Sequence, residues 1–84
     1  MSYEVVLKRS AEHELDAFRG SLFERIKRKL LSLESNPRPI GAQKLHGQNV
    51  YRIRVGDYRI LYVIDDAGKR VEVIGIAHRR EAYR

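Results

Sequence analysis

The chain has 84 residues, no cysteine and a formal net charge of +6 at pH 7. This length predicts a single domain over residues 1–84, and the absence of cysteine excludes disulfides, thiolate nucleophiles and cysteine-based metal sites. The N-terminus lacks the features of a signal peptide, and no apolar stretch reaches the length of a membrane span, so we expect a cytoplasmic protein without membrane contact. The basic charge makes nucleic acid a candidate partner.

The N-terminal half predicts one strand followed by two helices. Residues 3–7 form a short apolar run that is typical of a strand. Ser10 is expected to cap a helix that ends at Gly20, where a left-handed residue is usual. A second helix follows at once, because residues 21–24 have the form of a capping box, and Asn36-Pro37 stops it. The two helices are therefore short and antiparallel.

A basic run at residues 25–29 lies within the second helix. Our first interpretation is the solvent-facing side of an amphipathic helix, on which Glu24 and Arg28 form a weak i,i+4 pair. A non-specific contact with a nucleic-acid backbone is the alternative.

Residues 50–63 predict a β-hairpin. Two runs of β-branched and aromatic residues with period-2 alternation flank Gly56-Asp57, and a two-residue loop fixes the register of a hairpin. In this register Arg54 faces Arg59. Because side chains alternate across a strand, Arg52 joins these two arginines on one face, and the other face is apolar.

The clustering of three arginines on one face indicates a function. Like charges opposite each other destabilise a sheet, so Arg54 against Arg59 opposes folding. Guanidinium groups on rigid strands present planar forks of donors that suit a phosphate. A solvated face whose arginines pair with Asp57 or other acids is the simpler alternative, but three arginines in one register favour an anion site.

Residues 70–77 predict a third strand, joined to the hairpin by a turn. If Asp65 pairs with Arg70, two further cross-strand pairs follow, Leu61 with Ile74 and Arg59 with Ile76. An apolar strip then shares the face of the arginines: Leu61, Val63, Ile74 and Ile76.

The predicted fold class is therefore α+β: a strand, two antiparallel helices and a three-strand antiparallel meander, with both helices on one face of a small sheet. If both helices cover the opposite face, the apolar strip needs cover from elsewhere. The three histidines lack the spacing of a zinc site, and Asp65-Asp66 fits turn chemistry better than magnesium binding. We expect no metal and no cofactor.

Four motifs in order resemble the RelE/ParE toxin superfamily, and the resemblance covers essentially the whole chain. They are Lys44-Leu45-x-Gly47, Tyr51-Arg52-Ile53-Arg54, Asp57-Tyr58-Arg59-Ile60-Leu61-Tyr62 and His78-Arg79-Arg80-Glu81-Ala82-Tyr83. The last motif is more similar to the RelE branch than to the ParE branch. A RelE-like toxin is implied to be a ribosome-dependent, metal-independent endonuclease that cuts mRNA in the A-site codon. In that reaction the ribose 2′-OH attacks the adjacent phosphate and leaves a cyclic phosphate.

The resemblance also implies site residues. The basic residues of the hairpin match Arg52, Arg54 and Arg59, the arginine after the last strand matches Arg79, and the C-terminal tyrosine matches Tyr83. We expect the guanidinium groups to stabilise charge on the phosphoryl oxygens and the tyrosine to stack on a base. Lys44, Arg80 and Arg84 are expected to contact RNA.

The best-known RelE pattern has lysines where this chain has Arg52 and Arg54. Because arginine practically cannot act as a base, we expect His78 to titrate in their place. Lys44, His46 and Glu81 are alternative bases. Catalysis by orientation and charge stabilisation alone is a further alternative.

The implied partners are the ribosome, mRNA and a cognate antitoxin. The antitoxin is expected to have an acidic, partly disordered segment that folds across the apolar strip of Leu61, Val63, Ile74 and Ile76. Two other functions remain open: a ParE-like inhibitor of DNA gyrase, and a catalytically weak module that binds RNA or an antitoxin.

Overall fold

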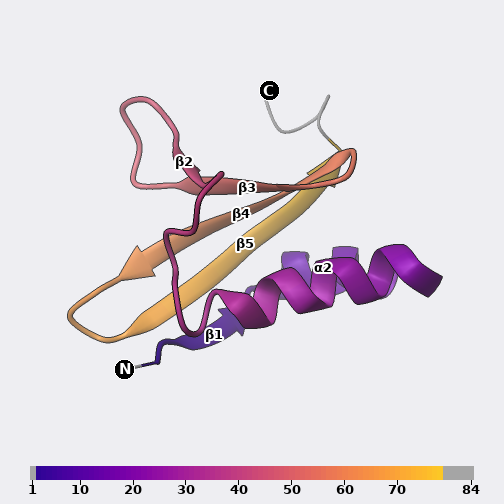
Figure 1. Cartoon of the computed structure of the whole chain (residues 1–84), viewed down its shortest axis with the longest axis horizontal. Coiled ribbons are helices and arrows are strands. Elements are labelled where there is room, and N and C mark those ends of the chain that lie inside the picture. Colours follow the sequence, from indigo (N-terminus) through magenta and orange to yellow (C-terminus); the bar gives the residue numbers. More distant parts are fainter. Residues whose placement is uncertain (1, 79–84) are drawn as a thin grey trace.

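In the computed structural model, which describes residues 2–78, one five-stranded sheet packs against two helices (Figure 1). The expectations for residues 79–84 lie outside the described residues. The elements are β1 (Glu4–Leu7), α1 (Arg9–Asp16), α2 (Gly20–Ser32), β2 (Gln43–Lys44), β3 (Tyr51–Val55), β4 (Tyr58–Asp65) and β5 (Arg70–His78). The strand order is β1-β5-β4-β3-β2, and β1 pairs with β5 in parallel.

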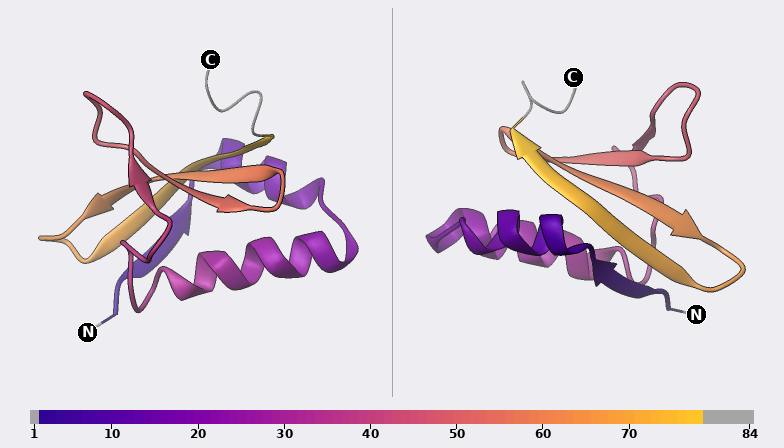
Figure 2. Two further views of the ribbon diagram at one scale, coloured as in Figure 1. Left: turned by 45° about the horizontal axis from the view of Figure 1, so that its top comes forward. Right: turned by 180° about the vertical axis from the view of Figure 1, so that it is seen from behind.

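The two helices run in opposite directions and cover one face of the sheet (Figure 2). Helix α2 contributes Ile26 and Leu30 to the core, where they meet the apolar face of β3, β4 and β5. The α+β class, the antiparallel helices and their position on one face were all predicted from the sequence. Neither described helix has the length and apolar character that a bilayer-spanning segment needs.

The helix ends differ from the prediction. Helix α1 has Lys8 at its N-cap without a side-chain hydrogen bond. The Ser10 hydroxyl instead donates to the Ile74 carbonyl on β5, 3.3 Å away, because the residue already lies inside the helix. Helix α1 ends at Asp16, and Gly20, with φ of +65°, begins α2 rather than closing α1.

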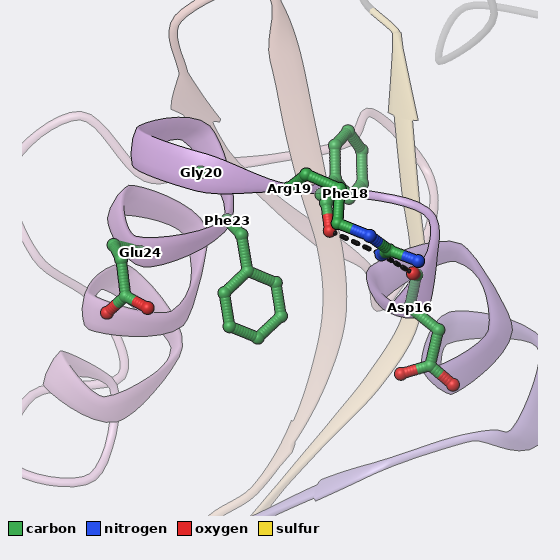
Figure 3. Close-up of a pocket in the computed structure, with 6 residues that line it drawn as sticks. All are labelled: Asp16, Phe18, Arg19, Gly20, Phe23 and Glu24. Carbon is green, nitrogen blue, oxygen red and sulfur yellow. Dashed lines mark hydrogen bonds between the residues drawn. The ribbon is translucent and has the colours of Figure 1, made fainter.

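The connection between the helices is held by an arginine instead of the predicted caps. The Arg19 guanidinium donates to the backbone carbonyls of Asp16 and Phe18, the second at 2.9 Å. Beside these bonds lies an open pocket of about 540 Å³ (Figure 3). Its lining residues are Asp16, Phe18, Arg19, Gly20, Phe23 and Glu24.

The β3–β4 hairpin has the predicted register. Arg54 pairs with Arg59, Ile53 with Ile60, and the loop is Gly56-Asp57. Because the loop has two residues, it leaves no freedom in the pairing.

The β4–β5 register is only partly as predicted. Asp65 does pair with Arg70, but the register shifts after the Tyr62–Val73 pair. Leu61 then pairs with Gly75, and Ile74 is the extra residue of a β-bulge. The predicted pairs of Leu61 with Ile74 and of Arg59 with Ile76 are therefore wrong.

The bulge changes the face of one predicted partner-binding residue. Ile76 pairs with Ile60 and is only 3% exposed, so its side chain lies in the core beneath the helices. It cannot join the apolar strip on the opposite face. Leu61 and Val63 do lie on that face and are half-buried, and Ile74 is half-buried at the bulge.

The short edge strand β2 was not predicted. Gln43 pairs with Arg52, and Lys44 pairs with Tyr51. Because β2 covers only the first two residues of β3, the remaining edge of β3 lies beside α2 (Figure 2).

Candidate anion-binding site

Three arginines from β3 and β4, with Gly41 and Gln43, form a pocket on the sheet face opposite the helices. Its volume is about 220 Å³. Strand β3 supplies Arg52 and Arg54, and β4 supplies Arg59 through the register that the sequence predicted. Gly41 and Gln43 complete the lining.

Two of the arginines are held by named acceptors. Arg52 Nη2 donates to Gln43 Oε1 at 2.7 Å, across the β2–β3 pair. Arg54 Nε donates to the Gly56 carbonyl at 3.0 Å, inside its own hairpin. Each of these bonds fixes the orientation of its guanidinium group.

The pocket is suited to an anion such as a phosphate. None of its five lining residues is acidic, and three of them carry a fixed positive charge. Arg54 and Arg59 are directly opposed, and two like charges in this arrangement repel each other. A bound phosphate would accept hydrogen bonds from the guanidinium forks and offset that repulsion.

Gln43 and Gly41 are site residues that the sequence prediction missed. The residue next to Gln43, Lys44, was expected to contact RNA, but alternation along β2 places its side chain on the other face. Lys44 lines a separate pocket of about 460 Å³ with His46 and neighbouring loop residues. A two-residue strand gives no periodic pattern, so only the position of Gln43 directly before Lys44 could have indicated its role.

His78 does not lie with the arginines. It pairs with Tyr58 at the end of β5, and the two rings meet edge to face with centroids 5.3 Å apart. The ring of Tyr58 also packs edge to face against that of Phe18, from the α1–α2 connection, with centroids 4.8 Å apart. His78 is therefore at the same end of the sheet as Arg54 and Arg59, but on its helix side.

The remaining predicted site residues lie outside the described residues. They are Arg79, Arg80, Glu81, Tyr83 and Arg84. Within residues 2–78, no group of three or more histidine, aspartate or glutamate side chains is placed to hold a metal ion.

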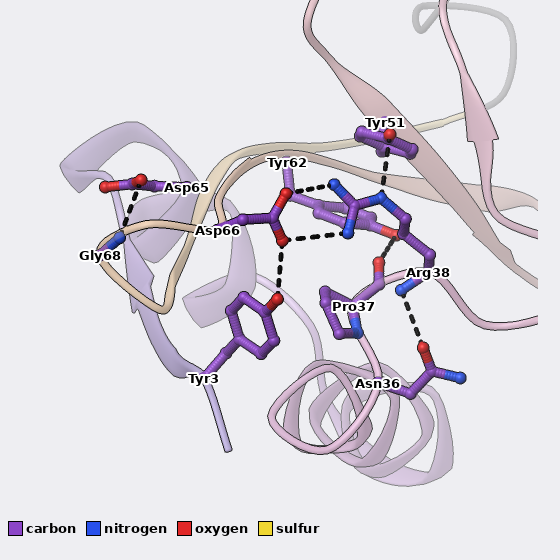
Figure 4. A network of polar contacts seen from close by, with 9 residues as sticks. All are labelled: Tyr3, Asn36, Pro37, Arg38, Tyr51, Tyr62, Asp65, Asp66 and Gly68. Atoms are coloured by element: carbon purple, nitrogen blue, oxygen red, sulfur yellow. Dashed lines mark hydrogen bonds and ion pairs between the residues drawn. The ribbon is translucent and has the colours of Figure 1, made fainter. Parts of the chain in front are cut away.

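A second polar cluster ties the loop before β2 to the sheet (Figure 4). Arg38 donates to both carboxylate oxygens of Asp66, at 3.1 and 2.8 Å, and to the Tyr51 hydroxyl at 3.1 Å. The Tyr3 hydroxyl also donates to Asp66, at 2.7 Å. The hydrogen bond from Arg38, and to a lesser extent that from Tyr3, lowers the pKa of Asp66 to about 2.

The neighbouring Asp65 belongs to the β4–β5 turn. Its carboxylate accepts a hydrogen bond from the Gly68 N–H, as the sequence predicted from turn chemistry.

Tyr62 on β4 anchors the loop before β2 from the core side. Its hydroxyl donates to the Pro37 carbonyl at 2.8 Å in the core. Burial, and secondarily the nearby Tyr51, raise the pKa of Tyr62 to about 12. These contacts position the loop that carries Gly41 and Gln43 to the arginine pocket.

Comparison with known proteins identifies the class to which this fold and pocket belong. A family model described as the ParE toxin of the type II toxin–antitoxin system, parDE, matches residues 5–83. The chain therefore belongs to this family of toxins.

Individual relatives place the chain in the RelE-like branch. It is 42% identical to Toxin RelE of Mycobacterium tuberculosis over 53 residues, which are 62% of this chain and 55% of that toxin. The match thus spans about half the length of this curated relative. In the archaeal RelE–RelB complex from Pyrococcus horikoshii OT3, one chain superposes with a TM-score of 0.84 at 26% identity, covering 94% of this chain and 97% of that one. A mutant of E. coli toxin RelE in the free state gives a TM-score of 0.81 at 26% identity, with coverage of 99% and 90%. The protein is a RelE-like toxin of a type II toxin–antitoxin system.

Proposed function

We propose that the protein is a ribosome-dependent endoribonuclease that cuts mRNA in the A-site codon without a metal ion. The observation that carries this proposal is the pocket of Arg52, Arg54 and Arg59, which presents three permanent cations from two paired strands. Cytoplasmic ribosomes would supply the substrate in a fixed orientation.

The chemistry asks little of the protein beyond positioning and charge. The 2′-oxygen attacks the adjacent phosphorus, the bond to the 5′-oxygen breaks, and a 2′,3′-cyclic phosphate remains. Negative charge grows on the phosphoryl oxygens, where Arg54 and Arg59 stabilise it, and Arg52 holds the RNA backbone. Arg79 or His78 would protonate the leaving 5′-oxygen, and Tyr83 would stack on an exposed base.

The proton on the 2′-OH must leave in this reaction. His78 is the titrating group proposed from the sequence, yet it lies against Tyr58 on the helix side of the sheet. For His78 to serve, the end of β5 must rearrange on the ribosome. If orientation and charge alone drive catalysis, a solvent water molecule takes this proton and no such movement is required, so the geometry favours this alternative.

The proposed partner is an antitoxin with an acidic segment. The relative from Pyrococcus horikoshii forms a complex with RelB. In this chain Leu61 and Val63 are apolar, half-buried and next to the arginine pocket, on the sheet face opposite α1 and α2. An acidic segment crossing both regions would bury the apolar side chains and neutralise the arginines. Ile74 remains part of this proposed surface, and the core residue Ile76 does not.

A purified translation reaction with excess chelator tests the nuclease. We expect discrete mRNA ends within A-site codons by primer extension, absent when ribosomes are omitted. Arg59→Ala combined with Tyr83→Ala should abolish the cuts, and Arg70→Ala, which removes an exposed arginine outside the pocket, should not. Intact mRNA in an otherwise active reaction would refute the proposal.

The family model's ParE description favours one second candidate, inhibition of DNA gyrase. A gyrase inhibitor has no need of a phosphate-binding arginine group. If gyrase is inhibited, and remains inhibited by the Arg59→Ala, Tyr83→Ala variant, this second function is the correct one. Either toxin activity predicts growth arrest on overproduction without a partner, and normal growth would contradict both.

A further inference from the structure

A basic groove separates helix α2 from the β3–β4 hairpin. It has a volume of about 410 Å³ and is continuous with the hairpin turn. The lining residues are Arg25, Arg28, Lys29, Ser32, Arg54, Val55 and Gly56. Four of these seven carry a positive charge and none is acidic.

The structure divides the basic run of α2 into two sides. Arg25, Arg28 and Lys29 line the groove, whereas the exposed Lys27 does not. Residues 2–78 contain two ion pairs among themselves, Arg38–Asp66 and Arg70–Glu4. No carboxylate of these residues is therefore paired with Arg25, Arg28 or Lys29. The predicted pairing of Glu24 with Arg28 is therefore not formed.

The groove adjoins the arginine pocket through one shared residue. Arg54 lines both, and its Nε is bonded to the Gly56 carbonyl at 3.0 Å. On the other side of the turn the Arg25 guanidinium lies against Gly56, where a Cβ would be 3.5 Å from its Nη2 atom. Positively charged side chains therefore line both the pocket and the groove, and Gly56 of the hairpin turn lies between Arg54 and Arg25. Asp57, the other residue of this turn, lines neither cavity.

Two kinds of polyanion could bind a basic groove, an acidic peptide and a nucleic-acid backbone, and the lining of this groove favours the second. An acidic peptide that folds on a protein is anchored mainly by apolar side chains, and the groove offers only Val55, which is 5% exposed. A nucleic-acid backbone needs only cations and hydroxyl donors, which Arg25, Arg28, Lys29 and Ser32 supply.

We propose that this groove binds the phosphate backbone of the single-stranded RNA whose neighbouring phosphate occupies the arginine pocket. The inference rests on the proposed nuclease function, since it extends the path of the same strand. It assigns Arg25, Arg28 and Lys29 to binding, with Arg54 as the link between the two sites.

Fluorescence binding of two labelled, fully 2′-O-methylated RNAs, a trimer and a dodecamer, tests the groove because neither RNA can be cleaved. We expect the wild type to bind the dodecamer more tightly and with a steeper salt dependence. Arg25→Ala combined with Arg28→Ala should weaken dodecamer binding roughly tenfold and reduce its log–log salt slope by about 1.4, the value for two phosphate contacts with a single strand. Trimer binding should change little.

Lys8→Ala combined with Lys27→Ala is the matched control. It removes the same charge from two exposed sites outside the groove, and thermal unfolding verifies that both variants are folded. Equal losses in the two variants would overturn the proposal, because net charge would then explain them. It would also be overturned if a polyglutamate peptide lost affinity in the groove variant while the dodecamer did not.

Failure of the groove is distinguishable from failure of the nuclease. If the wild type cuts mRNA and the groove variant retains full dodecamer binding, only the groove proposal is wrong. If dodecamer binding depends on the groove as expected but mRNA stays intact in the translation reaction, the groove is supported and the nuclease proposal is wrong.

Discussion

The carboxylate of Glu14 accepts a hydrogen bond from the backbone N–H of Ile76 at 2.8 Å and so joins α1 to the bulged strand β5. The bond occurs where the register of β4 and β5 shifts. A bulge disrupts the sheet ladder locally, and a side chain can then satisfy a backbone donor that the neighbouring strand does not.

Glu14→Ala should lower the free energy of unfolding by about 1–2 kcal/mol, because it leaves the N–H of a buried residue without its acceptor. Glu14→Gln keeps an acceptor oxygen at the same distance from the backbone and should recover most of the loss. Urea unfolding measures both. The exposed Glu12→Ala is the control, expected within about 0.5 kcal/mol of the wild type. Equal stability of Glu14→Ala and Glu12→Ala would contradict a role for this bond.

The bulge also explains how far the sequence could predict the sheet. The β3–β4 register followed from a two-residue loop, and it placed Arg54 opposite Arg59 correctly. The β4–β5 register began correctly at Asp65–Arg70 but failed beyond Tyr62, where a bulge interrupts the ladder beside a residue bonded to α1, 62 residues away in sequence. The alternation of apolar and polar residues along a strand carries no information about a contact with a distant helix.

The same limit applies to the site. The three arginines could be predicted because they lie on one hairpin with a fixed register. Gln43 could not, since β2 is too short to have a period and its place depends on a loop held by Arg38 and Tyr62. His78 lies at the end of the sheet that holds Arg54 and Arg59, but on the opposite face, because one extra residue in β5 reverses the face of every residue after it.

Gln43→Ala should reduce kcat/KM for mRNA cleavage about tenfold, a loss of about 1.4 kcal/mol in transition-state stabilisation. The reason is that Arg52 loses the acceptor that orients it, at 2.7 Å. Gln43 acts here as a positioning residue. Single-turnover cleavage on programmed ribosomes provides the measurement, and Gln48→Ala, in the adjacent exposed loop, is the control.

A double-mutant cycle separates positioning from general disturbance of the loop. In an Arg52→Ala background, Gln43→Ala should cause no further loss, because the partner that it orients is already absent. Additive losses would mean that Gln43 contributes independently of Arg52. Gln43→Glu retains an acceptor and should keep the orientation.

Tyr62→Phe should destabilise the fold by about 1–2 kcal/mol. It leaves the buried Pro37 carbonyl without the hydroxyl that donates to it at 2.8 Å, and an unsatisfied buried acceptor is costly. Thermal or urea unfolding measures the change. Tyr51→Phe, whose hydroxyl lies in the half-buried cluster with Arg38, should cost less. The opposite order would contradict the role of Tyr62 as the loop's anchor.

The raised pKa of Tyr62 makes the free energy of unfolding depend on pH in the alkaline range. Because its pKa is about 12 in the folded protein against an ordinary 10.0, the unfolded chain loses this proton first. The Tyr62 contribution to stability is therefore complete below pH 10 and falls as the pH rises toward 12. The stability difference between wild type and Tyr62→Phe should shrink over this interval.

Asp66→Asn should destabilise the protein at pH 6 through loss of the ion pair with Arg38. The pKa of Asp66 is lowered to about 2 from an ordinary 3.8, chiefly by Arg38 and then by Tyr3. A lowered pKa means that the stabilisation is complete above pH 3.8 and is lost as the pH falls through 2. The difference in unfolding midpoint between wild type and variant should therefore be constant from pH 7 to about 5 and vanish near pH 2. Asp57→Asn, from the exposed β3–β4 turn, is the charge-matched control, because within residues 2–78 Asp57 forms no ion pair.

Added salt should also reduce the difference in unfolding midpoint between wild type and Asp66→Asn, since both Arg38 and Asp66 are exposed to solvent. A gap that persists unchanged at pH 2 would mean that the amide substitution disturbs the turn itself, and that the charge of Asp66 contributes nothing.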